Sequence, residues 1–373
     1  MSNWIQCELG DLVIFQRGHD LPKTSMVKGK YPVVGSNGII GYHNEYTTDA
    51  PSITIGRSGN VGNPYIYYGK TWSHNTTLYI KEFKNIDPVF AYYFLRTLKL
   101  DNYAGGSAVP TLNRNHIHSL PVSVPSDVEI QKKIASILKN IDDKIEENNK
   151  INNNLAEQSQ AILKKYMDDF EYTLTPLGEI ANIIDCLHSK KPDMVDNSTK
   201  QLLQLNNITD TGFLDLSSKY YISETDYENW TRKCEIVEGD CVITNVGRIG
   251  AVSQAPVGTH AAMGRNMTCI RLKKDKPYYS FLITALLSNH IRREIMKNTD
   301  EGTIMGALNV KNIPLLQFPI FSSEQMQSLE ESLYPIRKSI EHNYLANQKL
   351  SDLRDALLPK LMSGTIDLSS VPI

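Results

Sequence analysis

The sequence of 373 residues has little cysteine, almost no net charge and no long apolar run. Its five cysteines are an odd number with no Cys-x-x-Cys pair, which indicates inert thiols rather than a disulfide framework or a metal site. No apolar run approaches the roughly 18 residues of a membrane helix, and the first residues lack the basic start and apolar core of a secretion signal. We therefore expect a cytoplasmic chain without a membrane segment.

The charges nearly cancel, with 39 Lys and Arg against 41 Asp and Glu and a formal net charge of -2. Such a balance says little about an anionic partner, because nucleic-acid binding depends on local basic patches rather than on the charge of the whole. Hydrophobic residues make up 41% of a chain that is too long for one ordinary core. We expect at least two domains.

Recognisable catalytic motifs are also missing. The segment Tyr68–Thr71 resembles the end of a phosphate-binding loop, but Pro64 stands where that loop needs its first glycine. The segment Asn63–Tyr65 lacks the second proline of the Asn-Pro-Pro-Tyr motif, and His116 and His118 have no third metal ligand nearby in sequence. We predict a chain that binds rather than catalyses, with no catalytic residue and no metal.

What the sequence does contain is an internal repeat. Each copy has an opening Leu-Gly pair, a short predicted strand that ends in a glycine turn, a polar pair that enters another strand, and a Leu-Asn segment. The matched pairs are Leu9–Asp11 with Leu177–Glu179, Arg57–Gly62 with Asn245–Gly250, His74–Ile80 with Arg265–Arg271, and Gly106–Asn113 with Gly302–Asn309. In each copy a shorter helix is also predicted, over Val89–Lys99 and over Tyr278–Lys297.

Each copy ends in a long helix with a heptad seam that is polar in its middle. Asn148 and Asn152 occupy two seam positions of the first helix, and Asn343 and Asn347 occupy the same positions of the second. If the helices lie antiparallel, Asn148 faces Asn347 and Asn152 faces Asn343. Such pairs penalise shifted registers; the alternative is a solvated asparagine-rich face. Pro335 predicts a kink, or a break into two segments, in the second helix.

This order of features resembles the DNA-specificity subunit of type I restriction-modification enzymes. The resemblance rests on the Trp4–Gly10 opening, the Arg57–Gly62 turn, the helix start Glu129–Leu138 and the duplication, and it covers nearly the entire chain. The fold class it implies is α+β, with two tandem β-rich target-recognition domains joined by two long antiparallel helices. The expected divisions are a first domain over 1–125, a spacer helix over 126–168, a second domain over 169–321, a second helix over 322–363 kinked near Pro335, and a tail over 364–373.

The resemblance also implies a function and partners. Each domain is expected to read one half of a split, asymmetric site in double-stranded DNA. Two modification subunits that carry S-adenosylmethionine and methylate adenine, and restriction subunits that use ATP and Mg, are the expected partners. Methylation and cleavage then belong to those other chains, and none of these cofactors is expected in this one.

The candidate DNA-binding residues follow from the chemistry of base edges, which requires side chains such as Arg, Lys, Asn, Gln, Ser or Thr on exposed loops. The repeat places such residues on equivalent loops. The predicted set is Arg57, Ser58, Lys70, His74, Asn75, Ser107 and Arg114 in the first domain and Asn245, Arg248, Arg265, Asn266, Thr303 and Lys311 in the second.

Two other functions remain open on the sequence. The chain could be a structural adaptor whose helical pair is the working surface and whose β-rich domains bind protein. It could also be the recognition part of a fused restriction-methylation enzyme, although such chains carry methyltransferase motifs that this sequence lacks.

Overall fold

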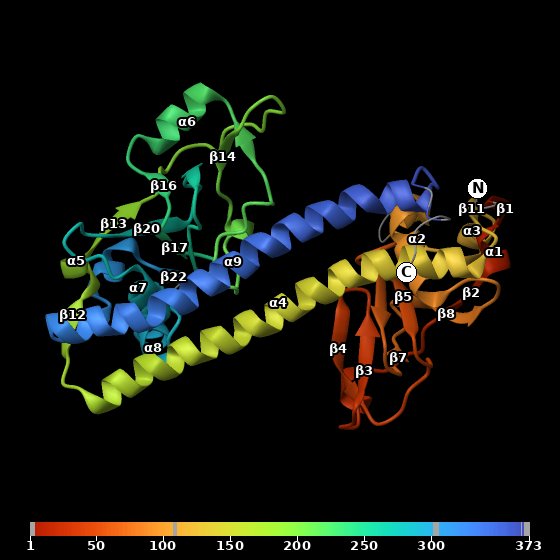
Figure 1. Ribbon diagram of the computed structural model, residues 1–373, viewed down its shortest axis with the longest axis horizontal. Helices are drawn as coiled ribbons and strands as arrows, with labels where there is room; N and C mark the ends of the chain where they lie inside the picture. Colours follow the sequence, from red (N-terminus) through yellow and green to blue (C-terminus); the bar gives the residue numbers. More distant parts are fainter. Residues whose placement is uncertain (1–3, 107–109, 301–305, 367, 369–373) are drawn as a thin grey trace. The chain divides into compact units, whose positions relative to one another are not determined.

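The computed structural model describes residues 4–106, 110–300, 306–366 and 368. The chain forms two compact units, the first made of Met1–Ile145 with Lys349–Ile373 and the second of Glu146–Gln348. Two long helices, α4 (Val128–Asp169) and α9 (Ser323–Met362), each contribute residues to both units (Figure 1). The predicted α+β class with two long helices is confirmed. None of the described helices has the length and apolar character needed to cross a membrane.

A four-stranded antiparallel sheet carries the core of the first unit. Its strand order is β2-β8-β5-β6, with β2 at Val13–Arg17, β8 at Thr77–Phe83, β5 at Ser52–Gly56 and β6 at Pro64–Tyr67. The β-branched side chains Ile53 and Ile55 of β5 are fully buried in a core that also contains Phe15 and Phe90. Strand β5 is the one predicted at Ser52–Ile55, and burial of its apolar side chains explains why it forms there.

Smaller elements complete the first unit. A second sheet has the order β4-β3-β7, and two further strand pairs are β1 with β11 and β9 with β10. The bounds are β1 Trp4–Glu8, β3 Tyr31–Gly35, β4 Gly38–His43, β7 Trp72–Ser73, β9 Ala104–Gly105, β10 Thr111–Leu112, β11 Pro121–Pro125, α1 Leu9–Leu12, α2 Pro88–Thr97 and α3 Arg114–His118. Helix α2 begins as predicted, with the Asp87 carboxylate accepting from the Phe90 amide at 2.9 Å.

The second unit repeats this plan and adds a larger second sheet. The main sheet has the order β13-β20-β17-β18 and the second sheet β15-β14-β19-β16, with β12 paired to β23 and β21 to β22. The bounds are β12 Thr173–Pro176, β13 Ala181–Asp185, β14 Lys200–Leu202, β15 Tyr221–Ile222, β16 Glu235–Val237, β17 Cys241–Thr244, β18 Val252–Gln254, β19 His260–Ala262, β20 Met267–Leu272, β21 Thr299–Asp300, β22 Ala307–Leu308, β23 Gln317–Ile320, α5 Leu177–Ile180 and α6 Glu224–Thr231.

The helix predicted over 278–297 is in fact two helices. Helix α7 spans Tyr279–Leu286 and α8 spans Asn289–Lys297. The break falls at Ser288, whose hydroxyl accepts from the Ile291 amide at 3.3 Å and starts α8. A serine cap inside an apolar stretch therefore outweighed the continuous helical pattern.

The backbone pairing confirms the repeat and corrects one of its alignments. The amide of Leu112 donates to the carbonyl of Arg57 at 2.9 Å, and the amide of Leu308 donates to that of Asn245 at the same distance. The turn glycines Gly59 and Gly247 share a φ of 83°. In the following strand, however, Thr77 pairs with Gly56 as Met267 pairs with Thr244. Asn75 is thus the structural counterpart of Arg265, one residue away from the predicted alignment.

Helices α4 and α9 run antiparallel within the second unit, where Asn148 bonds Asn347 and Tyr166 bonds Ser328. The amide of Asn148 donates to the Asn347 oxygen at 2.8 Å, and the amide of Asn343 donates to the Asn152 oxygen at 2.9 Å. Asn148 is 4% exposed, so its amide group needs this partner. The structure therefore contains both expected pairs, and their effect on helix register remains a prediction.

Helix α9 continues without interruption through Pro335. The hydroxyl of Ser339 donates to the carbonyl of Pro335 at 2.9 Å, one turn further on. The expectation of a break into two segments is thereby corrected, and the kink remains a prediction.

Candidate nucleic-acid interface

A basic cleft in the first unit brings together two of the predicted residues. Arg57 follows β5 and Arg114 begins α3, and both line a cleft of about 500 Å³ with Arg17 from the end of β2 and His116 from α3. The backbone bond from Leu112 to Arg57 holds the loop after β10 against the turn after β5. The fold thus gathers four cationic or titratable side chains from segments far apart in the sequence.

In the described part of the chain, no carboxylate is paired with the arginines of this cleft. Among the described residues, Arg17, Arg57 and Arg114 make no side-chain hydrogen bond or ion pair. Partial burial, and secondarily repulsion by Arg17, lower the pKa of Arg57. The cleft therefore presents uncompensated positive charge, which favours an anionic ligand.

The other predicted residues of the first domain that the structure describes do not line the cleft. Ser58 pairs with Thr111 beside it, while the amide of Asn75 donates to the Asp20 carboxylate at 2.5 Å. His74 shares a hydrogen bond of 3.0 Å with Thr76, and its partial burial lowers its pKa. Ser58 lies in the turn after β5, whereas His74 and Asn75 lie between β7 and β8. Ser107 lies outside the described residues.

Lys70 is placed away from the cleft. Its ammonium group donates to the Tyr46 hydroxyl at 2.8 Å and forms an ion pair of 2.8 Å with Asp49. The same group lies 4.0 Å from the centre of the Tyr46 ring. Lys70 is thus part of a separate surface cluster, and its contact with DNA remains a prediction.

In the second unit, Arg265 and Asn266 line a different cleft, of about 490 Å³. Both side chains are exposed, and Asn266 has the left-handed φ of 63° that asparagine tolerates. Lys191, Asn206 and Trp230 also line this cleft, the first two exposed and the tryptophan buried. Donors and amide oxygens therefore occur together here, which is the chemistry that base edges require.

Asn245 is buried, which corrects the expectation that its side chain lies on an exposed loop. Its side chain is 7% exposed, its amide donates to the carbonyl of Leu308 at 3.1 Å, and its oxygen accepts from Thr268 at 3.0 Å. These two bonds join the turn after β17 to β20 and β22. The buried Asn245 side chain therefore stabilises the loop through its two hydrogen bonds.

The remaining candidates of the second domain are more exposed. The Arg248 guanidinium donates to the carbonyl of Ile208 at 2.9 Å and is ion-paired with Asp210. Lys311 is exposed and follows the cap formed by Asn309, whose oxygen accepts from the Lys311 amide at 3.0 Å. Contact of these two residues with DNA remains a prediction. Thr303 lies outside the described residues.

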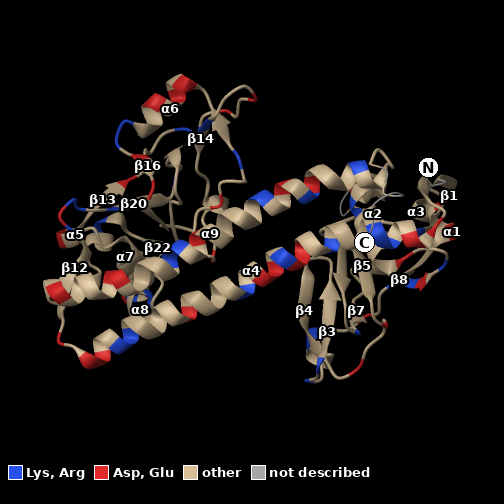
Figure 2. Cartoon of the chain, in the orientation of Figure 1, with Lys and Arg blue, Asp and Glu red and all other residues tan. Residues whose placement is uncertain are grey.

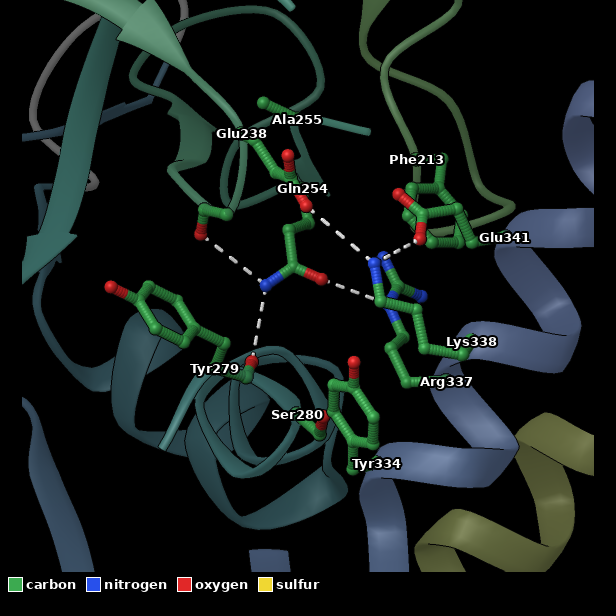
Figure 3. A pocket seen from close by; sticks show the side chains of 11 residues that line it. Phe213, Glu238, Gln254, Ala255, Tyr279, Ser280, Tyr334, Arg337, Lys338 and Glu341 are labelled. Atoms are coloured by element: carbon green, nitrogen blue, oxygen red, sulfur yellow. Dashed lines mark hydrogen bonds and ion pairs between the residues drawn. The ribbon is translucent and has the colours of Figure 1, made fainter. Parts of the chain in front are cut away.

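A third cavity, of about 360 Å³, lies where α9 meets the sheets of the second unit (Figure 3). Arg337 of α9 stacks over the Phe213 ring at 3.4 Å, donates to the Gln254 oxygen at 2.9 Å and to the Gly212 carbonyl at 2.7 Å. Burial lowers the pKa of Arg337 to about 9. Because Arg337 is bound to three groups of the β-rich domain, it attaches the helix to that domain.

Arg17, Lys191 and Asn206 were missing from the sequence-based set. The signal for Arg17 was its place at the end of the apolar strand Val13–Arg17, opposite Leu78 on β8. For Lys191 and Asn206 the sequence offered only polar loop segments. Figure 2 shows Lys, Arg, Asp and Glu interspersed over the chain, so a simple search for basic runs does not find these clefts.

The structure combines two β-rich units on a repeated plan with polar clefts and two long helices. Residues 1–157 match the family described as the type I restriction modification DNA specificity domain. The chain is 28% identical over 165 residues to the EcoprrI specificity subunit of Escherichia coli, which covers 42% of this chain and 41% of that subunit. It is 24% identical over 381 residues to a putative type I specificity subunit of Mycoplasma pneumoniae, with 96% of each covered.

A solved structure shows the same fold. The type I restriction-modification S subunit from M. genitalium aligns over 96% of both chains with a TM-score of 0.59 and 17% identity. The family model and these relatives bear out the resemblance to type I specificity subunits that the sequence suggested.

Proposed function

We propose that this chain recognises a bipartite, asymmetric site in double-stranded DNA, with one half-site read by each β-rich domain. The observation that carries this proposal is that the two units, built on one repeated scaffold, have different polar clefts at different positions. The first unit presents Arg17, Arg57 and Arg114 in its cleft, and the second presents Arg265 and Asn266 in another. Unlike domains on a common frame are suited to unlike half-sites, whereas identical domains suit a palindrome.

The chain contributes DNA-sequence recognition to a restriction-modification system, and we propose that catalysis lies on its partners. Two modification subunits would bind S-adenosylmethionine and methylate adenine, and restriction subunits would use ATP and Mg to cleave. The absence of a cofactor loop and of Asn-Pro-Pro-Tyr from this sequence supports the division.

The motif can be identified by sequencing the methylome of a host with and without this chain, in the presence of the modification subunits. The expected result is a split motif whose methylation depends on the chain. Methylation of a continuous palindrome would contradict two unlike recognition domains. If the chain were instead an adaptor, the purified protein would show no salt-dependent binding to duplex DNA.

The two long helices are proposed to set the distance between half-sites. One heptad inserted after Lys150 in α4, with a second after Leu345 in α9, keeps both asparagine pairs in phase. Each insertion lengthens its helix by about 10 Å, which corresponds to roughly 3 base pairs. We expect both half-sites to be unchanged and the spacer to grow by about one to three base pairs.

A parental spacer in the methylome of the doubly extended variant would show that the helices do not set the distance. The matched control carries two alanine substitutions in place of the insertions, at Lys150 and Leu345, and should keep the parental spacer.

A further inference from the structure

The basic cleft of the first unit is built from three separate segments. Arg17 ends β2, Arg57 lies in the turn after β5, and Arg114 begins α3. All three line one hollow of about 500 Å³ together with His116. Because three positive side chains share a small concave space, their mutual repulsion costs free energy unless an anion is bound.

The other two arginines of this unit are both paired with carboxylates. Arg96 lies 3.7 Å from the Asp355 carboxylate, and Arg354 is ion-paired with Asp142 at 2.7 Å. The three cleft arginines, in contrast, have no such partner among the residues that the structure describes. The unit thus pairs the arginines that it uses structurally and leaves the charge of the cleft uncompensated.

The second unit shows that the scaffold does not require this charge. Strand pairing makes Asp185 the counterpart of Arg17, because each faces the equivalent residue of the neighbouring strand. The loop bonds of Leu112 and Leu308 make Asn245 the counterpart of Arg57 and Val310 that of Arg114. An acidic, an amide and an apolar residue therefore occupy these positions in the same fold. The shared fold therefore does not require arginine at these three positions.

We propose that this cleft binds a backbone phosphodiester of the DNA that the first domain recognises, and so anchors that domain on the duplex. The inference rests on the proposed function and deepens it. A phosphodiester carries one negative charge and accepts several hydrogen bonds, which suits converging guanidinium groups. A base edge requires a set of donors and acceptors specific to its identity. The side-chain oxygen of Asn113, which lines the cleft, already accepts from the Asn115 amide, so it is not free to accept from a base.

The test uses the full chain and duplexes that carry its methylome-defined motif. The variants Arg17→Ala, Arg57→Ala and Arg114→Ala are each expected to weaken binding roughly tenfold for all sequences alike, with base preference unchanged at every position. The slope of log affinity against log salt should fall by about 0.9 for each lost phosphate contact. Arg57→Lys keeps the charge but loses the planar fork, so its loss should be smaller.

Two controls locate the effect. Lys81→Ala removes an exposed positive charge from β8 of the same unit and should leave the salt slope unchanged. A methylphosphonate placed at each linkage of the first half-site in turn should weaken the wild-type chain at one linkage, and at that linkage should weaken Arg57→Ala much less. Thermal unfolding of each variant reports whether the fold is intact.

Three results would overturn the assignment. If a variant changes the preferred base at one position, the cleft reads a base edge. If all three alanine variants keep the wild-type affinity and slope while the wild type binds its motif, the cleft does not contact DNA, although the proposed function stands. If the wild-type chain binds no DNA, the proposed function and the phosphate site are both wrong.

Discussion

The two units place different chemistry on the same backbone, and the turn that follows β5 and β17 shows it most clearly. In both turns a carbonyl accepts from a leucine amide at 2.9 Å. The residue bearing that carbonyl is Arg57 in the first unit, directed to a basic cleft, and Asn245 in the second, buried and bonded to Leu308 and Thr268. Equivalent position in a repeat therefore does not imply equivalent role, and recognition residues need to be assigned unit by unit.

The largest expected effect comes from exchanging these two residues. Asn245→Arg forces a long cation into an enclosed site and leaves the Leu308 carbonyl and Thr268 hydroxyl without their partner, so we expect a loss of about 3 kcal/mol or more in the stability of the second unit. Arg57→Asn should change stability by less than about 0.5 kcal/mol. Denaturant unfolding of both variants measures the difference, and equal losses would contradict the assigned roles.

A second contrast concerns how each unit holds its helices. In the second unit Arg337 of α9 bonds Gln254 and Gly212, whereas in the first unit Asp142 of α4 accepts from Tyr93 at 2.6 Å and from Arg354. Arg337→Ala removes the stacking on Phe213 and leaves the Gln254 side-chain oxygen without its donor, while the Gly212 carbonyl still accepts from the Gln254 backbone amide.

We expect Arg337→Ala to lower the stability of the second unit by about 2 kcal/mol. Hydrogen exchange should show faster exchange in α9 near residue 337 and none of this effect in β2, β5 or β8. Loss of protection in both units alike would show that the attachment is not local. The matched control is Arg293→Ala, which changes an exposed arginine on α8 whose guanidinium donates to the Asn289 carbonyl.

A smaller effect is expected at the asparagine pairs. Replacing Asn148, Asn152, Asn343 and Asn347 with leucine should raise stability by about 1–2 kcal/mol, because apolar packing replaces two partly buried amide pairs. The same change should permit alternative helix pairings or self-association, measured by sedimentation velocity and by cross-linking of introduced cysteines. A quadruple variant that is less stable and still uniquely paired would show that these residues do not fix the register.

Much of the fold could be predicted from the sequence because it depends on local patterns. The strands at β5 and β17 follow from short apolar, β-branched runs, and the Asp87 cap predicts the start of α2. The division of the 278–297 segment at Ser288 was missed, since a serine within an apolar stretch is compatible with either a cap or a helix interior.

The candidate site was less predictable because it depends on which strands pair. Arg17 reaches the cleft only through the pairing of β2 with β8, which contains a bulge between Ile14 and Phe15. The alignment of Asn75 with Arg265 likewise depends on strand register rather than on residue similarity. The burial of Asn245 was hidden for the same reason, since its partners Leu308 and Thr268 are distant in sequence.

The first unit is made of two segments that are far apart in the sequence, which affects the order in which the two units fold during synthesis. Its core contains Leu358, Leu361, Met362 and Leu368 together with residues that precede 146, whereas the second unit is one continuous segment. At typical elongation rates the ribosome needs on the order of 10–40 s to pass from residue 145 to residue 349. The first unit therefore has an incomplete core until the end of the chain is synthesised. The second unit, although translated later, is the first whose core can be completed.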